Sequence, residues 1–342
     1  MSRSSAMKAV GFLSSKPVSD PDCLQVFDLP EPDLRPTDLR VAVEAVSVNP
    51  ADAKVRQRTA PDAPLDAPRI LGFDAVGIVE AVGADVTGFR TGDRVWYAGD
   101  ASRQGSNAEL QAVDHRIAAL APTSVSPEAA ASLPLVSLTA WEMLFDRLQV
   151  PTGNRPGTLL VIGGAGGVGS ITLQLARRLT CLDLVATASR KESADWCREM
   201  GAHATVDHRD LLAAYRASGR NYAGFIAQYA DLSQHWAAMC ELVAPQGRIG
   251  TIVETPDRID ISALQAKSAA LMWELMFTRS AFGTPDMAEQ GRILFRVARL
   301  VDDGVIRTID TDLRHGLTAE TFRAAHETVE IGAMIGKLVV KY

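Results

Sequence analysis

The chain has 342 residues, of which 47% are hydrophobic and 22% charged, and its formal net charge is −6. This composition is that of an ordinary globular protein with enough apolar surface to offset the chain entropy of folding, which excludes a disordered chain. The acidic balance leaves no broad basic field, so we expect no nucleic-acid partner and no anionic membrane partner.

The first 125 residues are predicted to form short strands. Segments 39–48, 75–82 and 94–97 are rich in β-formers and are separated by turn signals such as Thr91-Gly92-Asp93. An irregular or barrel-like all-β module is the natural interpretation.

From residue 126 the pattern changes to alternating strands and helices, beginning with a helix over 127–144 that is broken near Pro134. Such βαβ alternation predicts a parallel sheet with helices on both faces. The predicted strands are 158–162, 184–188, 204–206, 222–228 and 248–253, and the predicted helices are 167–179, 192–200, 209–217 and 233–243.

The last part of the chain returns to mixed structure. Segment 269–277 is apolar and ambiguous between strand and helix, 285–303 and 318–331 are predicted helices, and 337–341 is a predicted strand. We therefore expect an α/β protein in which a doubly wound domain with a parallel sheet, residues 126–285, is inserted between residues 1–125 and 286–342 of a β-barrel-type domain.

Cysteine usage and the N-terminus indicate a cytoplasmic protein. The four cysteines are scattered without a CxxC pair, which fits buried thiols in a reducing compartment. Residues 1–6 lack an apolar signal region, and we interpret the uncharged stretch 157–176 as a buried strand-turn-helix and not as a membrane span.

A glycine-rich turn is the strongest local signal. Gly164, Gly166 and Gly169 satisfy GxGxxG between an apolar strand and a helix that begins near Gly167 and Val168. The first glycine is expected to permit the tight turn, the second close approach of a pyrophosphate, and the third strand–helix packing, with the helix N-terminus facing the negative charge. The alternative is a glycine-rich turn without a ligand.

The end of the second strand of this unit favours NADPH over NADH. An NAD enzyme usually carries an acidic residue there for the ribose 2′-hydroxyl, whereas this chain has Ser189-Arg190-Lys191. A hydroxyl and two cations suit a 2′-phosphate. The alternative is a solvated basic helix start.

Together these residues resemble the medium-chain dehydrogenase/reductase superfamily over nearly the whole chain, and particularly its zinc-free quinone oxidoreductase branch, in the bacterial subgroup called "zinc-type alcohol dehydrogenase-like". The motifs that carry the resemblance are 45–52, 71–77, 97–100, 105–109, 137–142, 163–169, 273–274 and 277–279.

The resemblance implies a GroES-like domain, a Rossmann domain, and a homodimer or homotetramer. It also places Thr139 beside the nicotinamide, adds Phe277 to the cofactor site, and weakly suggests that His208 and Lys337 reach the adenosine phosphate. For Thr139 the alternative is a helix-interior threonine that bonds its own backbone.

Two positions depart from the zinc alcohol dehydrogenases. Asn49 stands where those enzymes have a zinc-binding cysteine, and Phe73 where they have a histidine. Neither an amide nor a phenyl ring replaces a thiolate or an imidazole at zinc, so we expect no metal.

Without a Lewis acid, the expected substrate is a small electron-poor molecule, a quinone or an α,β-unsaturated carbonyl. Asn49 and Tyr97 are the candidate catalytic residues, because each could donate a hydrogen bond to the developing oxyanion, and Asn49 could also bind the cofactor ribose. The alternatives are a turn-forming Asn49 before Pro50 and a Tyr97 that only packs.

Two other functions remain open. One is a zinc-dependent alcohol dehydrogenase. The other is a non-catalytic NADPH-binding sensor or structural protein, which would share every cofactor residue.

Overall fold

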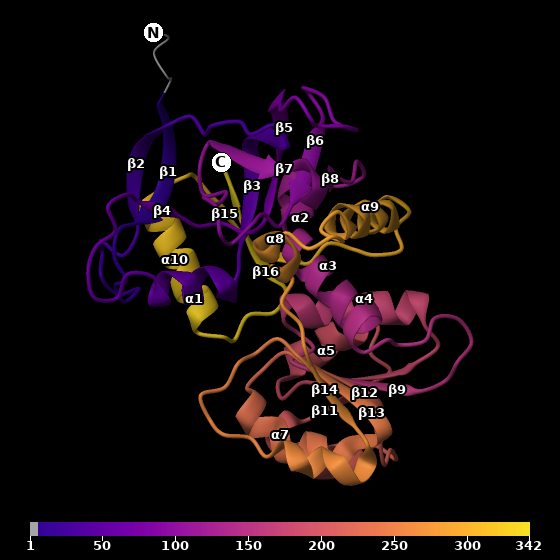
Figure 1. Ribbon diagram of the computed structural model, residues 1–342. Coiled ribbons are helices and arrows are strands. Elements are labelled where there is room, and N and C mark those ends of the chain that lie inside the picture. The colour runs from indigo at the N-terminus through magenta and orange to yellow at the C-terminus, as the bar shows by residue number, and fades with distance from the viewer. Residues whose placement is uncertain (1–5) are drawn as a thin grey trace. The chain divides into compact units, whose positions relative to one another are not determined.

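The computed structural model describes residues 6–342. The chain forms two compact units: the first comprises residues up to Leu135 together with Phe277–Tyr342, and the second comprises Val136–Met276. Figure 1 shows the chain passing from the first unit into the second and back again. The second unit is therefore an insertion in the first.

These limits differ from the expected 125/126 and 285/286 by about ten residues at each crossing. Helix α2 (Pro127–Ala131) packs against strands β3 (Asp38–Val48) and β5 (Ala75–Val82) of the first unit. The short helix α8 (Thr278–Phe282) also belongs to that unit. A change from strands to helices marks the boundary poorly, because a domain built mainly of strands also uses helices to cover its sheets.

Two sheets form the first unit. A three-stranded sheet has the order β2-β1-β4, and a larger sheet has the order β15-β16-β3-β5-β6-β8, with β7 paired to β3. Pairing is antiparallel except between β15 and β16. The remaining strands are β1 (Ala6–Phe12), β2 (Gln25–Pro30), β4 (Arg69–Ile70), β6 (Arg94–Tyr97), β7 (Leu110–Asp114), β8 (Ala118–Leu120), β15 (Asp310–His315) and β16 (Lys337–Lys341).

Helices α1 (Pro50–Arg58), α9 (Glu289–Asp302) and α10 (Ala319–Glu330) complete this unit, together with a 3₁₀ turn, η1 (His115–Ile117). Helix α1 begins with Pro50, whose missing N–H costs nothing at a first helical position. Asp52 in its first turn and Arg56 and Arg58 in its last turn complement the helix dipole.

The second unit is built on a parallel sheet with the order β11-β10-β9-β12-β13-β14. Its strands are β9 (Thr158–Ile162), β10 (Asp183–Thr187), β11 (Ala204–Val206), β12 (Ala223–Gln228), β13 (Val243–Thr251) and β14 (Ala270–Trp273). This order confirms the doubly wound α/β fold, in which the chain builds outward from β9 in one direction and then from β12 in the other.

Helices α4 (Gly167–Leu179), α5 (Lys191–Glu199), α6 (Leu211–Ala217) and α7 (Leu232–Leu242) connect these strands. Right-handed crossovers place α4 and α5 on one face and α7 on the other, as Figure 1 shows. Helix α3 (Pro134–Trp141) continues as a π turn, η2 (Glu142–Arg147), and two 3₁₀ segments, η3 (His208–Asp210) and η4 (Ile261–Lys267), complete the elements.

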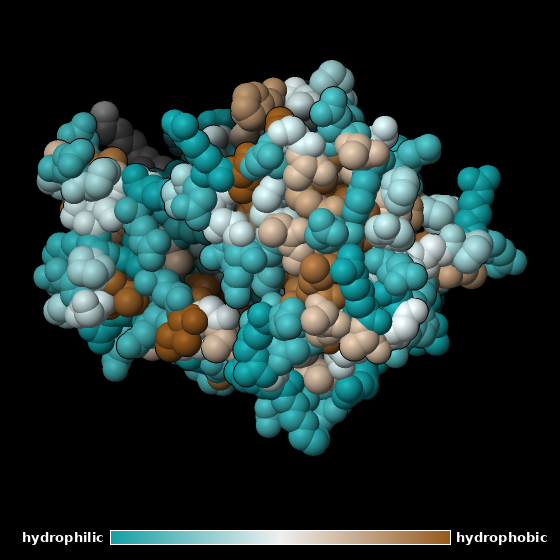
Figure 2. Space-filling view, turned by 90° about the horizontal axis from the view of Figure 1, so that it is seen from below, coloured by the Kyte–Doolittle hydropathy of each residue, from teal (hydrophilic) through white to brown (hydrophobic). Residues whose placement is uncertain are grey.

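The core of the second unit is formed by side chains from both faces of the sheet, among them Leu160, Ile226, Ile249, Tyr215 and Trp236. Figure 2 shows one face of the molecule, on which hydrophilic residues predominate and apolar residues lie in small groups between them. Within residues 6–342, no helix is long and apolar enough to span a membrane.

Candidate functional site

The glycine-rich turn connects the end of β9 at Ile162 to the start of α4 at Gly167. Strand β9 lies between β10 and β12, so the turn is at the point where the strand order reverses. In open α/β sheets, ligands bind at the carboxyl ends of the strands at such a switch point.

The glycines of this turn have different tasks. The left-handed turn residue is Gly163, at φ +83°, and not Gly164 as expected from the motif. Gly164 is needed because a Cβ there would lie 2.8 Å from the Cβ of Ala186, and at Gly169 it would collide with the carbonyl oxygen of Gly163. At Gly166 the nearest atom would be 3.7 Å away, so this backbone is open to a ligand.

The N-terminus of α4 offers donors to an anion. Gly166 is its cap and provides no side-chain acceptor, and the first turn, which contains Gly167 and Val168, carries no acidic residue. Backbone N–H groups at such a helix start have no intrahelical partner and bear partial positive charge. The turn therefore fits a dinucleotide pyrophosphate in shape and in charge.

The predicted 2′-phosphate residues lie at the same edge of the sheet. Ser189 and Arg190 follow β10, and Arg190 is the exposed N-cap of α5. His208 follows β11, and its Nε2 lies 3.0 Å from Oγ of Ser189. Lys191 is engaged locally, because its Nζ lies 2.6 Å from Oδ2 of Asp195.

Sequence reasoning missed a buried carboxyl pair in the second unit. Glu142 of η2 and Glu274 after β14 are both buried, and Nε of Arg147 lies 2.7 Å from Oε2 of Glu274. Burial and the neighbouring Glu142 raise the pKa of Glu274 to about 9. The carboxyl pair thus holds a proton at neutral pH. It links the π turn η2 to the end of β14. Thr139, which precedes this turn, is a buried residue of α3.

In the first unit, three polar side chains form a buried cluster around Asp74. Its Oδ2 accepts hydrogen bonds from Oγ of Ser47 (2.6 Å), Nδ2 of Asn49 (2.7 Å) and Nζ of Lys337 (3.3 Å). Its Oδ1 accepts the backbone N–H of Leu135 at 2.7 Å. The Asp74 carboxylate is therefore satisfied on both oxygens.

Lys337 fixes the orientation of Asn49. The ammonium donates to Oδ1 of Asn49, and the Lys337 side chain is only 4% exposed. An ammonium can only donate and a carboxylate can only accept, so the amide oxygen must face Lys337 and the amide nitrogen must face Asp74. That nitrogen also lies 3.4 Å from the carbonyl oxygen of Ser47, so both amide hydrogens already have acceptors.

Asp52 connects two loops beside this cluster. It accepts the N–H of Asn49 at 2.8 Å and the N–H of Gly72 at 2.9 Å. Burial raises the pKa of Asp52 to about 7, against the opposing effect of these hydrogen bonds. Asp52 therefore caps the start of α1 and links it to the loop that contains Gly72.

Tyr97, at the end of β6, is 1% exposed, and its hydroxyl has no hydrogen-bond partner within residues 6–342. Burial raises the pKa of this phenol well above its usual value, so it remains protonated. Tyr342 is a neighbour in this part of the unit, but its hydroxyl donates to the carbonyl oxygen of Ser106 at 2.8 Å. Of these two phenols, only Tyr97 keeps an uncommitted donor.

Phe73 and Phe277 pack against each other, with ring centroids 4.9 Å apart and an interplanar angle of 63°. Both are buried in the first unit. The residues at the two positions expected to distinguish this chain from zinc enzymes are therefore both engaged, Asn49 with charged groups and Phe73 with an aromatic ring.

This set does not fit a zinc ion. Around Asn49 it offers no thiolate or imidazole, and the ammonium of Lys337 would repel a second cation. Across residues 6–342, no group of three His, Cys, Asp or Glu side chains is arranged to hold a metal.

The structure thus gathers the predicted residues into two sets, one in each unit. Gly164, Gly166, Gly169, Ser189 and His208 share the carboxyl edge of the parallel sheet. Asn49 and Lys337 are in direct contact in the first unit, which also contains Tyr97 and Phe277. No periodicity brings positions 49 and 337 together, so sequence reasoning did not pair them.

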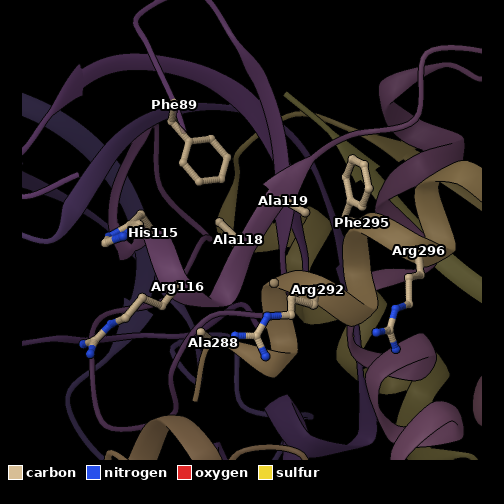
Figure 3. A pocket seen from close by; sticks show the side chains of 10 residues that line it. Phe89, His115, Arg116, Ala118, Ala119, Ala288, Arg292, Phe295 and Arg296 are labelled. Atoms are coloured by element: carbon tan, nitrogen blue, oxygen red, sulfur yellow. The ribbon is translucent and has the colours of Figure 1, made fainter. Parts of the chain in front are cut away.

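A cavity of about 480 Å³ opens elsewhere on the first unit and contains none of the predicted residues. Figure 3 shows Phe89 and Phe295 on either side of Ala118 and Ala119, with Arg116, Arg292 and Arg296 below them. Arg116 pairs with Asp114 at 2.7 Å and Arg292 with Glu289 at 2.6 Å. These pairs neutralise much of the positive charge, and we assign no chemistry to this cavity.

Comparison with known proteins identifies the family to which this fold belongs. Residues 35–123 match the family "Alcohol dehydrogenase GroES-like domain", and residues 200–340 match "Zinc-binding dehydrogenase". The fold and these matches define an oxidoreductase of the medium-chain dehydrogenase/reductase superfamily.

Within that superfamily the chain belongs to the zinc-type alcohol dehydrogenase-like proteins. It is 39% identical over 338 residues to one such protein of Staphylococcus aureus (strain MSSA476), with 98% of this chain and 99% of the relative covered. A putative zinc-dependent alcohol dehydrogenase from Rhizobium etli CFN 42 superimposes with a TM-score of 0.93 at 45% identity, over 98% of each chain.

Two more distant relatives are named for an enzymatic activity. A 2-methylene-furan-3-one reductase of Solanum lycopersicum is 36% identical over 185 residues, covering 52% of this chain and 46% of that protein. The Escherichia coli quinone oxidoreductase, solved with NADPH, has a TM-score of 0.81 at 23% identity, over 98% of this chain and 100% of that one. At 23% identity, the similarity to the Escherichia coli enzyme shows a shared fold only.

Proposed function

We propose that this protein is an NADPH-dependent, zinc-independent oxidoreductase that reduces quinones or α,β-unsaturated carbonyls. The buried cluster of Lys337, Asn49 and Asp74 carries the zinc-independent part of the proposal. Asn49 stands at the position where the resemblance places a zinc-binding cysteine, and its amide is already engaged by the ammonium of Lys337 and the carboxylate of Asp74.

The preference for NADPH is supported by the carboxyl edge of β10. Ser189 and the exposed Arg190 follow this strand, and His208 lies beside Ser189. Asp183 is at the opposite end of β10 and pairs with Arg220 at 2.5 Å, so it is not a ribose ligand. A guanidinium, a hydroxyl and an imidazole can all donate hydrogen bonds to phosphate oxygens.

When bound, the nicotinamide supplies the hydride. The chain's own residues would bind the pyrophosphate at the start of α4 and stabilise the negative charge that develops on the substrate oxygen. Tyr97 is the leading donor, because its hydroxyl is protonated and has no partner among the described residues. Both amide hydrogens of Asn49 are engaged, so we propose that Asn49 holds the neighbouring loops in place and does not donate to the substrate.

The choice of substrate rests on chemistry. Without a metal, an unactivated ketone lacks its usual polarising group, whereas a quinone or an enone accepts hydride with help from hydrogen bonds alone. The tomato relative, named as a reductase of a methylene-furanone, supports the enone class.

Turnover and metal content together test this proposal. Purified protein should oxidise NADPH with a panel of quinones and enones, keep that activity after prolonged chelation, and contain far less than one zinc per chain. Stoichiometric zinc, or saturated alcohols with NADP⁺ as the best substrates, would favour the zinc-dependent alcohol dehydrogenase that the family name suggests. Binding of NADPH without turnover on any acceptor would favour a sensor.

A further inference from the structure

His208 and Ser189 lie side by side because β10 and β11 are neighbouring parallel strands. Thr187 is opposite Val206 in the register, and Ser189 and His208 each follow two residues later. Their side chains meet with Nε2 of His208 3.0 Å from Oγ of Ser189. The imidazole is therefore fixed beside the hydroxyl at which the proposed function places the 2′-phosphate.

The other ring nitrogen of His208 has an unusual environment. Nδ1 is buried and has no hydrogen-bond partner in the described part of the chain. The ring packs edge-on against His235, with centroids 5.9 Å apart and an interplanar angle of 88°. His235 is 3% exposed, and burial, followed by the influence of His208, lowers its pKa, so it stays neutral and adds no charge.

The charged groups on the surrounding elements are mostly committed to other partners. Asp207 binds Arg209 through both oxygens, while Asp210 and Asp231 accept backbone N–H groups at the starts of α6 and α7. Arg190 is a permanent cation. His208 is thus the side chain held at hydrogen-bond distance from Ser189, and histidine is the residue type that gains a proton most readily when an anion binds beside it.

From this arrangement we infer that His208 makes recognition of the 2′-phosphate depend on proton uptake, so that the preference for NADPH over NADH increases as pH falls. The inference rests on the proposed NADPH specificity. A phosphate beside Ser189 favours the imidazolium because opposite charges at hydrogen-bond distance stabilise each other. NADH has a neutral hydroxyl at that position, which does not stabilise the imidazolium.

Binding measurements without substrate test the inference. The dissociation constants of NADPH and NADH are measured by calorimetry between pH 6 and pH 8, in two buffers of different ionisation enthalpy. For the wild type we expect the ratio of Kd for NADPH to Kd for NADH to rise about tenfold over this range, with net proton uptake on binding NADPH only.

His208→Gln keeps a polar side chain but cannot titrate, and we expect it to remove most of this pH dependence and leave NADH affinity unchanged. Unchanged NADH affinity also shows that the variant is folded. The phosphate itself titrates near pH 6, but that contribution is present in both proteins, so their difference isolates His208. His315→Gln, an exposed histidine in the first unit, is the matched control and should behave like the wild type.

Two different failures can be told apart. If the wild type binds NADH as tightly as NADPH at every pH, the proposed cofactor is wrong and this inference falls with it. If NADPH is preferred but His208→Gln keeps the full pH dependence and proton uptake, the cofactor proposal survives and the role of His208 is overturned.

Discussion

The hydroxyl of Tyr97 is a buried polar group without a partner in residues 6–342, and such groups carry a cost in free energy unless a ligand or water satisfies them. If it donates to the substrate oxygen in the transition state, Tyr97→Phe should lower kcat by ~10²-fold with unchanged cofactor affinity. Steady-state kinetics and NADPH titration measure both quantities.

The control for Tyr97→Phe is Tyr215→Phe, which removes a phenol hydroxyl that donates to the carbonyl oxygen of Tyr222 in the second unit. It should leave kcat unchanged. Full kcat for Tyr97→Phe on every accepted substrate would instead mean that Tyr97 only packs and that water supplies the proton.

Lys337 gives a second prediction for a single residue. Lys337→Met should destabilise the protein by about 3–5 kcal/mol, because it leaves the carboxylate of Asp74 buried without its cation. Chemical denaturation measures the loss. Combining Lys337→Met with Asp74→Asn should recover a large part of it, and a double variant as unstable as the single one would contradict the ion-pair explanation.

For single residues, the sequence indicated which side chains need hydrogen bonds but not which residues provide them. A buried carboxylate needs several hydrogen-bond donors, and Asp74 accepts four hydrogen bonds from protein groups. Its pairing with Lys337 depends on β16 lying next to β3, a contact between residues far apart in the chain. Residue type predicts which groups need partners, whereas tertiary pairing decides which partners they find.

At the scale of elements, the contact between α1 and α10 contains a buried histidine. Nε of Arg56 lies 3.4 Å from Nδ1 of His326, and burial, followed by the charge of Arg56, lowers the pKa of His326 to about 3. His326 therefore stays neutral when folded but gains a proton below about pH 6.5 when unfolded. Its contribution to stability is complete above pH 6.5 and is lost as pH falls.

We predict that His326→Gln reduces the loss of stability between pH 7 and pH 5 by about 2 kcal/mol. Unfolding free energies at the two pH values provide the measurement. The exposed His315→Gln should retain the wild-type difference. If His326→Gln also retains it, His326 is not the group responsible for acid sensitivity in this range.

Elements with strong local signals were predicted with accurate bounds. Strands β9, β11 and β16 and helix α4 begin and end where the apolar pattern and turn residues predicted. The helical prediction over 127–144 with a break near Pro134 is confirmed by α2 and α3, whereas the π turn η2, which follows from Glu142, was not predicted. Strand β15 was missed, since its alternating exposure includes several charged residues.

For the molecule as a whole, the open edge of the parallel sheet is a candidate interface. Strand β14 is the last in the order and consists of Ala270-Leu271-Met272-Trp273, without the charge or proline that usually protects an edge strand. Trp273 is 53% exposed and Leu275, just beyond it, is 59% exposed. Unpaired backbone groups beside exposed apolar side chains favour pairing with a second chain.

We therefore expect a homodimer in which the β14 edges of two copies meet. Trp273→Glu should shift the mass measured by light scattering or sedimentation towards the monomer, because it places like charges at a two-fold contact. Ile331→Glu, at a 72% exposed apolar position in the first unit, is the control and should leave the mass unchanged. A wild-type monomer would contradict the expected homodimer. A Trp273→Glu variant that stays dimeric while Ile331→Glu dissociates would show that the interface is in the first unit and not at β14.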